Sequence, residues 1–122
     1  KQTFKCCLDQ NLLNCLIGNL GVKYVVNAIW KHEKPIEEDG HRDYMRILTD
    51  TLNSEKYVLE TIWYKIDDYT HGSVAVYKSE EAYNAFLDTN EMQRNFALED
   101  RKVSMLVQYK GPAFAVQTEL VG

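Results

Sequence analysis

The clearest signal in the hydrophobic and polar pattern is a strand that passes directly into a helix between Val74 and Leu87. An alternating apolar run comes first, as expected of a buried strand. Ser79 can then cap a helix whose first turn holds two glutamates, where the helix dipole favours negative charge. Tyr83 and Phe86 follow at helical spacing and share one face with Leu87. This junction predicts a β-to-α connection.

The same patterns predict the other elements. A helix over 41–52 is indicated by an apolar stripe, and turn-forming residues at 67–72 predict a hairpin. Asp88 to Asn90 should interrupt the second helix, which would resume to about residue 100. Residues 103–110 fit either a strand or an ordered loop, and Gly111-Pro112 should end that segment. The expected strands are 22–32, 57–66, 73–77 and 113–121, and the expected helices are 41–52 and 79–87.

This order, β-α-β-β-α-β, predicts an α+β domain of the ferredoxin-like type, with a four-stranded antiparallel sheet and both helices on one face. Both faces of the expected strands are apolar. In the first strand, Tyr24 and Val26 lie on one side, and Val25 and Ile29 flank Asn27 on the other. A sheet with one solvated face should instead alternate apolar and polar residues. We therefore expect a homodimer that covers the second face.

The chain divides into an N-terminal arm over 1–20 and a domain over 21–122. Leucines at helical spacing predict a short amphipathic helix in the arm, ending near Gly18. All three cysteines lie in the arm, and an odd, crowded set does not form a disulfide framework. Reduced thiols in a cytoplasmic protein are the favoured interpretation.

Composition excludes several classes of protein. The chain carries 14 basic and 18 acidic residues, for a net charge of −4, and has no basic cluster for nucleic acid. No apolar run reaches the roughly 20 residues that a membrane span needs.

His32, His41 and His71 are scattered without metal-ligand spacing, so no metal site is predicted. His32 and His71 are expected to be solvated.

A family resemblance is carried by the strand-to-helix junction described above and by the segment Asn90-Glu91-Met92 that follows it. Together they resemble the third strand and second helix of antibiotic-biosynthesis-monooxygenase domains, which belong to the dimeric α/β barrel superfamily. The first strand, with Asn27 at its middle, is similar to the family's opening strand. The resemblance covers about residues 22–121.

Three functions remain open, of which the resemblance implies the first and the third and the second is the competing hypothesis. The first is a monooxygenase that uses no cofactor and acts on a quinol- or anthrone-like aromatic, whose deprotonated form reacts with oxygen in a pocket between sheet and helices. The second is a non-catalytic homodimeric module for an apolar ligand or a protein partner. The third, minor one is haem binding or degradation. In that branch a Trp and a His act with the strand Asn, but Phe86 and Phe96 occupy their positions here.

The candidate site residues follow from these alternatives. Asn27 either donates to a substrate oxyanion or bonds to neighbouring backbone or water, and the residues alone leave both open. His41 and Tyr44 are the candidate acid–base residues. Four aromatic side chains would shape or line the substrate pocket: Trp30, Trp63, Phe86 and Phe96.

Overall fold

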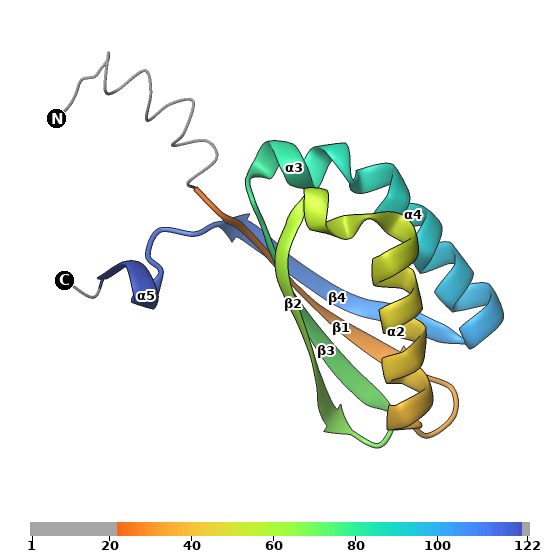
Figure 1. Ribbon diagram of the computed structural model, residues 1–122. Coiled ribbons are helices and arrows are strands. Elements are labelled where there is room, and N and C mark those ends of the chain that lie inside the picture. Colours follow the sequence, from red (N-terminus) through yellow and green to blue (C-terminus); the bar gives the residue numbers. More distant parts are fainter. Residues whose placement is uncertain (1–21, 121–122) are drawn as a thin grey trace, which may run out of the picture.

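The computed structural model describes residues 22–120, and the predicted N-terminal arm lies outside these residues. Four antiparallel strands form one sheet in the order β2-β3-β1-β4. The strands are β1 (Tyr24–His32), β2 (Val58–Asp67), β3 (Thr70–Tyr77) and β4 (Val103–Pro112). The domain is therefore α+β, with helices packed on one face of the sheet (Figure 1).

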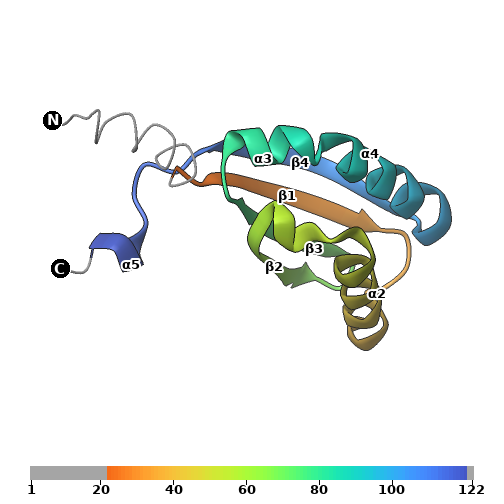
Figure 2. The ribbon, with the colours of Figure 1, turned by 45° about the horizontal axis from the view of Figure 1, so that its top comes forward.

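The helices connect the strands in the predicted order. They are α2 (Glu38–Leu52), α3 (Glu80–Ala85), α4 (Leu87–Phe96) and a terminal turn α5 (Gln117–Leu120). A 3₁₀ turn, η1 (Ser54–Lys56), follows α2, and a π-helical turn, η2 (Ala97–Arg101), follows α4. Helices α2, α3 and α4 all cover the same sheet face, whereas α5 lies near the start of β1 (Figure 2).

Several predicted boundaries are wrong. Helix α2 begins at Glu38 and not at residue 41, and β3 begins at Thr70 and not at residue 73. The fourth strand is 103–112, and residues 113–120 contain a loop and α5 rather than a strand. β4 ends at Pro112, as the Gly111-Pro112 pair predicted, and both residues still pair with β1 because β4 is an edge strand, where proline is tolerated. The break in the second helix falls at Phe86 instead of 88–90, because the buried Phe86 ring directs the chain into the core there.

A compact aromatic core holds α3 onto one end of the sheet. Its buried members are Tyr24, Val26, Tyr77, Tyr83 and Phe86. Tyr83 packs on the rings of both strand tyrosines, with centroids 5.2 Å and 5.1 Å apart. By contrast, α2 and α4 have no buried residue. The sheet and helices are therefore packed tightly at one end and loosely at the other.

The uncovered face of the sheet is apolar. Cross-strand partners share a face, so the pairing of β1 with β3 places Val25, Asn27 and Ile29 away from the helices. A bulge between Val58 and Glu60 shifts the register of β2 there, and Val58 faces the helices. The uncovered face presents Val25, Asn27, Ile29, Glu60, Ile62, Tyr64, Val74, Val76, Val107 and Tyr109.

The start of α3 offers a test of local structure. Ser79 Oγ accepts a hydrogen bond from the Ala82 backbone N–H at 3.0 Å, which confirms the predicted cap. Replacing Ser79 with Ala should lower the free energy of unfolding by about 1 kcal/mol in urea titrations. Thr89 lies inside α4 without capping it, so Thr89→Ala should change the free energy by less than about 0.5 kcal/mol. Equal effects of the two substitutions would contradict the cap assignment.

Candidate functional site

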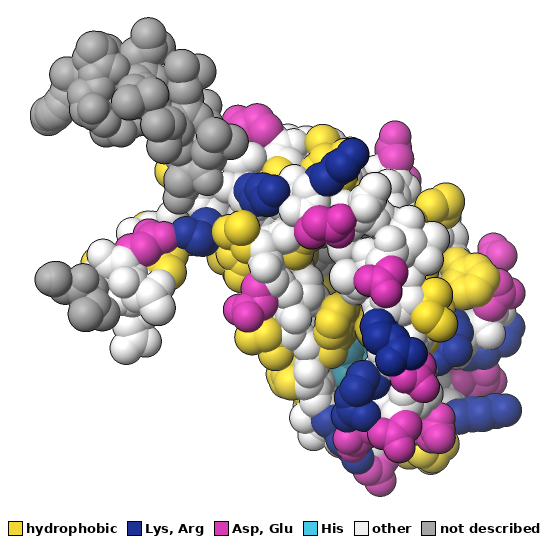
Figure 3. All heavy atoms as spheres, viewed as in Figure 1, with side chains coloured by type: hydrophobic (Ala, Val, Ile, Leu, Met, Phe, Trp, Pro, Cys, Tyr) yellow, Lys and Arg dark blue, Asp and Glu magenta, His cyan; other side chains and the backbone are white. Residues whose placement is uncertain are grey.

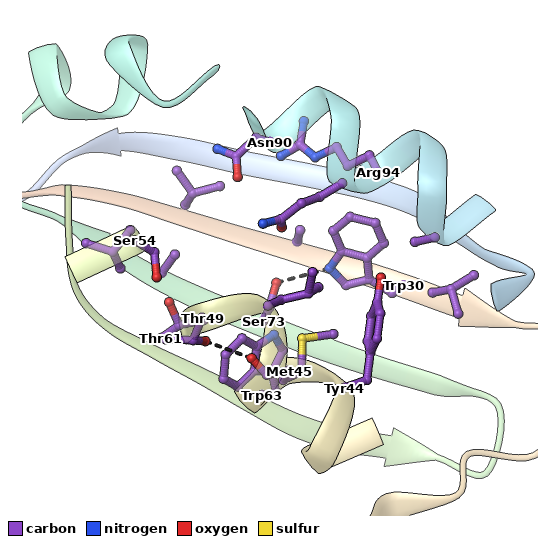
Figure 4. A pocket seen from close by; sticks show the side chains of 18 of the residues that line it. Trp30, Tyr44, Met45, Thr49, Ser54, Thr61, Trp63, Ser73, Asn90 and Arg94 are labelled. Carbon is purple, nitrogen blue, oxygen red and sulfur yellow. Dashed lines mark hydrogen bonds between the residues drawn. The ribbon is translucent and has the colours of Figure 1, made fainter. Parts of the chain in front are cut away.

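A cavity of about 160 Å³ lies between the sheet and helices α2 and α4. Its floor is formed by the helix-facing side chains of all four strands, including Ala28, Thr61, Ser73 and Val103. One side is formed by the apolar stripe of α2 and another by α4 and η2 (Figure 4). In the space-filling view, a histidine is visible in a hollow on this face of the molecule, beside Lys and Arg side chains (Figure 3).

Aromatic rings form much of the cavity wall. Trp30 projects from β1 and donates its indole N–H to Ser73 Oγ at 3.0 Å, which fixes the ring over the sheet. Tyr44 comes from α2 and Trp63 from β2, on the opposite side of the cavity (Figure 4). Phe86 closes the wall towards the aromatic core. Such a wall suits a flat apolar ligand.

Three histidines meet at one end of the site. The Nε2 atom of His32 and the Nδ1 atom of His71 are 2.7 Å apart, within hydrogen-bond distance. The ring of His41 lies 4.8 Å from that of His71 and 5.4 Å from that of His32, measured between centroids. His41 and His71 line the cavity. Since no described residue bonds to the buried Nε2 atom of His41, this cluster has an unmet hydrogen-bonding group.

All three imidazoles are neutral at pH 7. Burial, with smaller contributions from His41 and His32, lowers the pKa of His71 from its ordinary 6.5 to about 3. Burial, the neighbouring His32 and the Arg101 cation lower the pKa of His41 to about 4. Burial and Arg101 also lower the pKa of His32. A neutral imidazole offers one N–H donor and one acceptor nitrogen.

The other polar groups of the cavity lie on the α2 and α4 sides. Burial raises the pKa of Tyr44 above 10, so its hydroxyl stays protonated and can donate a hydrogen bond. Arg101 lies over the Tyr44 ring, with its guanidinium carbon 4.2 Å from the centroid. Asn90 donates to the Tyr77 hydroxyl at 2.9 Å, and Arg94 donates to Gln108.

The structure brings together five of the seven residues predicted for the site. Trp30, His41, Tyr44, Trp63 and Phe86 all line the cavity.

The other two predicted site residues lie elsewhere. Asn27 is on the uncovered face of the sheet, where it donates to the Ser73 carbonyl at 3.0 Å, so it does not reach the cavity. Strand alternation explains this correction, because Asn27 has the opposite parity to Val26 and Ala28. Phe96 does not line the cavity either. It stacks on Tyr44 from outside, with centroids 6.2 Å apart and 46% of its surface exposed.

The expectation that His32 and His71 are solvated is wrong, since they are only 8% and 5% exposed. The signal was present in the sequence, because His32 continues the helix-facing positions of β1 that include Ala28 and Trp30. Sequence reasoning also missed Arg94 and Arg101, which line the cavity from α4 and η2. Isolated arginines on a polar helix carry no distinguishing pattern.

The histidine cluster does not form a metal site in this arrangement. Within residues 22–120, no group of three or more His, Cys, Asp or Glu side chains has a geometry that could hold a metal ion. The 2.7 Å separation between the nitrogens of His32 and His71 is that of a hydrogen bond. Two nitrogens bound to one tetrahedral zinc would lie about 3.3 Å apart.

No family model matches the chain, and no curated protein matches it significantly. Within the described residues, no helix is both long and apolar enough to cross a membrane. The functional argument therefore depends on the geometry of the cavity.

The buried histidines predict a specific acid response. Because the folded-state pKa values lie below 6.5, the stabilisation is fully present above pH 6.5 and declines as the pH falls towards about 4 for His41 and 3 for His71. His71→Gln should therefore reduce the pH dependence of the unfolding free energy between pH 6 and 4.5 by about 1 kcal/mol per pH unit. Urea titrations at several pH values measure this dependence. Ser73→Ala is the control, because it changes a neighbouring group that does not titrate and should leave the pH dependence of the unfolding free energy unchanged. If His71→Gln also left this pH dependence unchanged, His71 would not be buried in the neutral form.

Proposed function

We propose that the cavity binds a small electron-rich aromatic molecule and that the protein oxygenates it without a cofactor. The observation that carries this proposal is a cavity lined by aromatic rings with two neutral imidazoles at one end. The proposal includes membership of the antibiotic-biosynthesis-monooxygenase type, which the order of elements and of strands in the sheet supports. Packing and exclusion of water would orient the substrate for reaction with oxygen.

The volume of the cavity selects among the aromatic substrates. An engineered protein cavity of about 150 Å³ holds benzene. A cavity of about 160 Å³ therefore fits a single ring with small substituents better than a three-ring anthrone or a porphyrin. A monocyclic quinol is accordingly the substrate class that we propose.

The reaction needs no external reductant. A neutral imidazole, which we assign to His41, accepts a proton from the quinol, and the Tyr44 hydroxyl donates to the oxyanion that develops. The ring carbon of the anion then bonds to oxygen, and loss of water leaves a hydroxyquinone. One quinol and one O₂ give one hydroxyquinone and one water, so all four electrons come from the quinol.

Oxygen uptake tests this proposal. With 1,4-hydroquinone and a chelator present, we expect one O₂ to be consumed per quinol, above the rate of the buffer alone, with 2-hydroxy-1,4-benzoquinone as product. His41→Gln should lower the catalysed rate at least about 100-fold, because it removes the proton acceptor. Asn27→Ala is the matched control and should retain the rate, since Asn27 lies on the other face of the sheet.

A non-catalytic binding module is the second candidate, and one observation favours it. A base whose pKa is about 4 removes a proton from a phenol only weakly. Quenching of Trp30 and Trp63 fluorescence by hydroquinone without oxygen uptake would support binding alone. Neither quenching nor uptake would overturn both candidates.

We also propose that two copies of the chain pair through their uncovered sheet faces, as in a dimeric α/β barrel. On this face Ile62 is 52% exposed and Tyr109 65% exposed. Four strands of this length span about 20 by 30 Å, or roughly 600 Å², which approaches the ~800 Å² that each partner buries in a standard interface. Register places few charged residues on this face, namely Glu60 and, at one end, Lys31 and Asp67, and because their signs are mixed two copies would meet with little charge repulsion.

Sedimentation of the full chain tests the dimer. At micromolar concentration the wild type should sediment as a dimer, and Ile62→Glu should shift it towards the monomer by at least tenfold in dissociation constant. Ile47→Glu is the matched control, because Ile47 is 58% exposed on the outer side of α2. A wild-type monomer at these concentrations would refute the pairing and point to another cover for the face, such as the N-terminal arm.

A further inference from the structure

The charge of the cavity wall is unlike that of the whole chain. Acidic residues exceed basic ones by 18 to 14 overall, but among the described residues none that lines the cavity is Asp or Glu. Two arginines, Arg94 and Arg101, do line it. Since the cavity histidines are neutral, the wall carries a formal charge of +2.

Neither arginine is paired with a described carboxylate. The ion pairs of residues 22–120 involve other cations, namely Lys23, Arg42, Arg46 and Lys65. Instead, Arg101 lies over the Tyr44 ring. Arg94 lies over the Trp30 ring, with its guanidinium carbon 6.0 Å from the centroid (Figure 4). A guanidinium in such a cation–π contact keeps N–H groups that can bind an anion, although Arg94 already donates one of its N–H groups to Gln108.

An anion would pair with these cations, of which Arg94 is half-buried and Arg101 remains exposed to solvent. Cations that are partly removed from water are stabilised by an opposite charge with direct hydrogen bonds. Carboxylates match the fork of a guanidinium and accept two parallel hydrogen bonds from it. The wall around these arginines is aromatic, so the anion that fits is one attached to an aromatic ring.

We propose that the ligand of the cavity is a monocyclic aromatic acid whose carboxylate is bound by Arg101. The positive charge of Arg94 adds to the electrostatic attraction for this carboxylate. This inference rests on the proposed function, because it assigns a chemical class to the ligand of the same cavity. The ring would lie between Trp30, Tyr44 and Trp63, and the single-ring limit follows from the volume of about 160 Å³. A quinol that bears a carboxylate satisfies both proposals.

The carboxylate would also act on the histidine cluster. Arg101 is one of the causes that lower the pKa of His41. A bound anion that neutralises Arg101 removes this contribution, and its own charge favours the imidazolium. The ligand would thereby make His41 a stronger base than it is in the empty cavity.

A matched pair of ligands tests the charge requirement. At pH 7.5, 4-hydroxybenzoate is ionised, whereas 4-hydroxybenzamide is neutral and of nearly equal size. Isothermal titration with the full chain should give a dissociation constant at least about tenfold lower for the acid, and the preference should shrink as salt is raised. Equal affinity for acid and amide would overturn the inference while leaving the proposed function standing. Binding of neither ligand would count against both.

Substitutions then assign the preference to individual arginines. Arg101→Gln should bring the affinity for the acid within about threefold of that for the amide, and Arg94→Gln should reduce the preference less. Arg101→Lys keeps the charge and should retain part of the preference even if the glutamine variant folds poorly. Arg46→Gln is the control, because Arg46 lies on the exposed side of α2 and pairs with Asp43. A preference that survives Arg101→Gln in a folded protein would refute the role of Arg101.

Discussion

Packing between rings of α3 and the sheet is the interaction on which the rest of the structure depends. Tyr83 and Phe86 insert between the strands and the helix layer and pack on Tyr24 and Tyr77. This contact holds the helices at one end of the sheet. At the other end α2 and α4 have no buried residue, and the space between the layers remains open. Protein interiors are normally filled to high density, so a hollow of this size is a feature that needs an occupant or a function.

The polar groups in that hollow follow a consistent electrostatic rule. Desolvation excludes positive charge from the imidazoles of His41 and His71, and the two arginines keep theirs because a guanidinium does not lose its proton in proteins. Cation–π contacts with Tyr44 and Trp30 hold the two guanidinium groups beside the cavity. The site therefore carries positive charge from the arginines, while its imidazoles stay neutral. An anionic ligand would balance the charge of the arginines and would favour protonation of the imidazoles.

The sequence was sufficient for the elements whose signals are local. The Ser79 cap, the stripe of α2 and the alternation of β1 depend on neighbouring residues, and each is present in the structure. The position of the last strand was wrong because β4 has no clear alternation and is defined by its pairing with β1, which is a contact between distant segments. The break at Phe86 was displaced for a similar reason, since tertiary packing decided it against local helix signals.

The candidate site was predictable to the extent that strand parity and helix spacing were applied at every position. Trp30, Trp63 and Tyr44 were predicted from their side-chain chemistry. Strict parity would have kept Trp30, placed His32 with the helix-facing residues of β1 and removed Asn27 from the pocket. No pattern in the sequence could have predicted that the ring nitrogens of His32 and His71 are 2.7 Å apart, because residues 39 positions apart meet only through the register of β1 with β3.

Strand alternation also separates the two roles proposed for the sheet, which are to line the ligand cavity on one face and to pair with a second copy on the other. Side chains of one parity close the cavity, and those of the other parity, such as Val25 and Ile29, form the uncovered face. A substitution on one face therefore changes the other only through the backbone. Ser73 illustrates this separation, because its backbone carbonyl accepts the Asn27 amide on the uncovered side while its hydroxyl accepts the Trp30 indole N–H on the cavity side. The two bonds use different groups of Ser73, so loss of the Asn27 amide leaves the Trp30 bond in place.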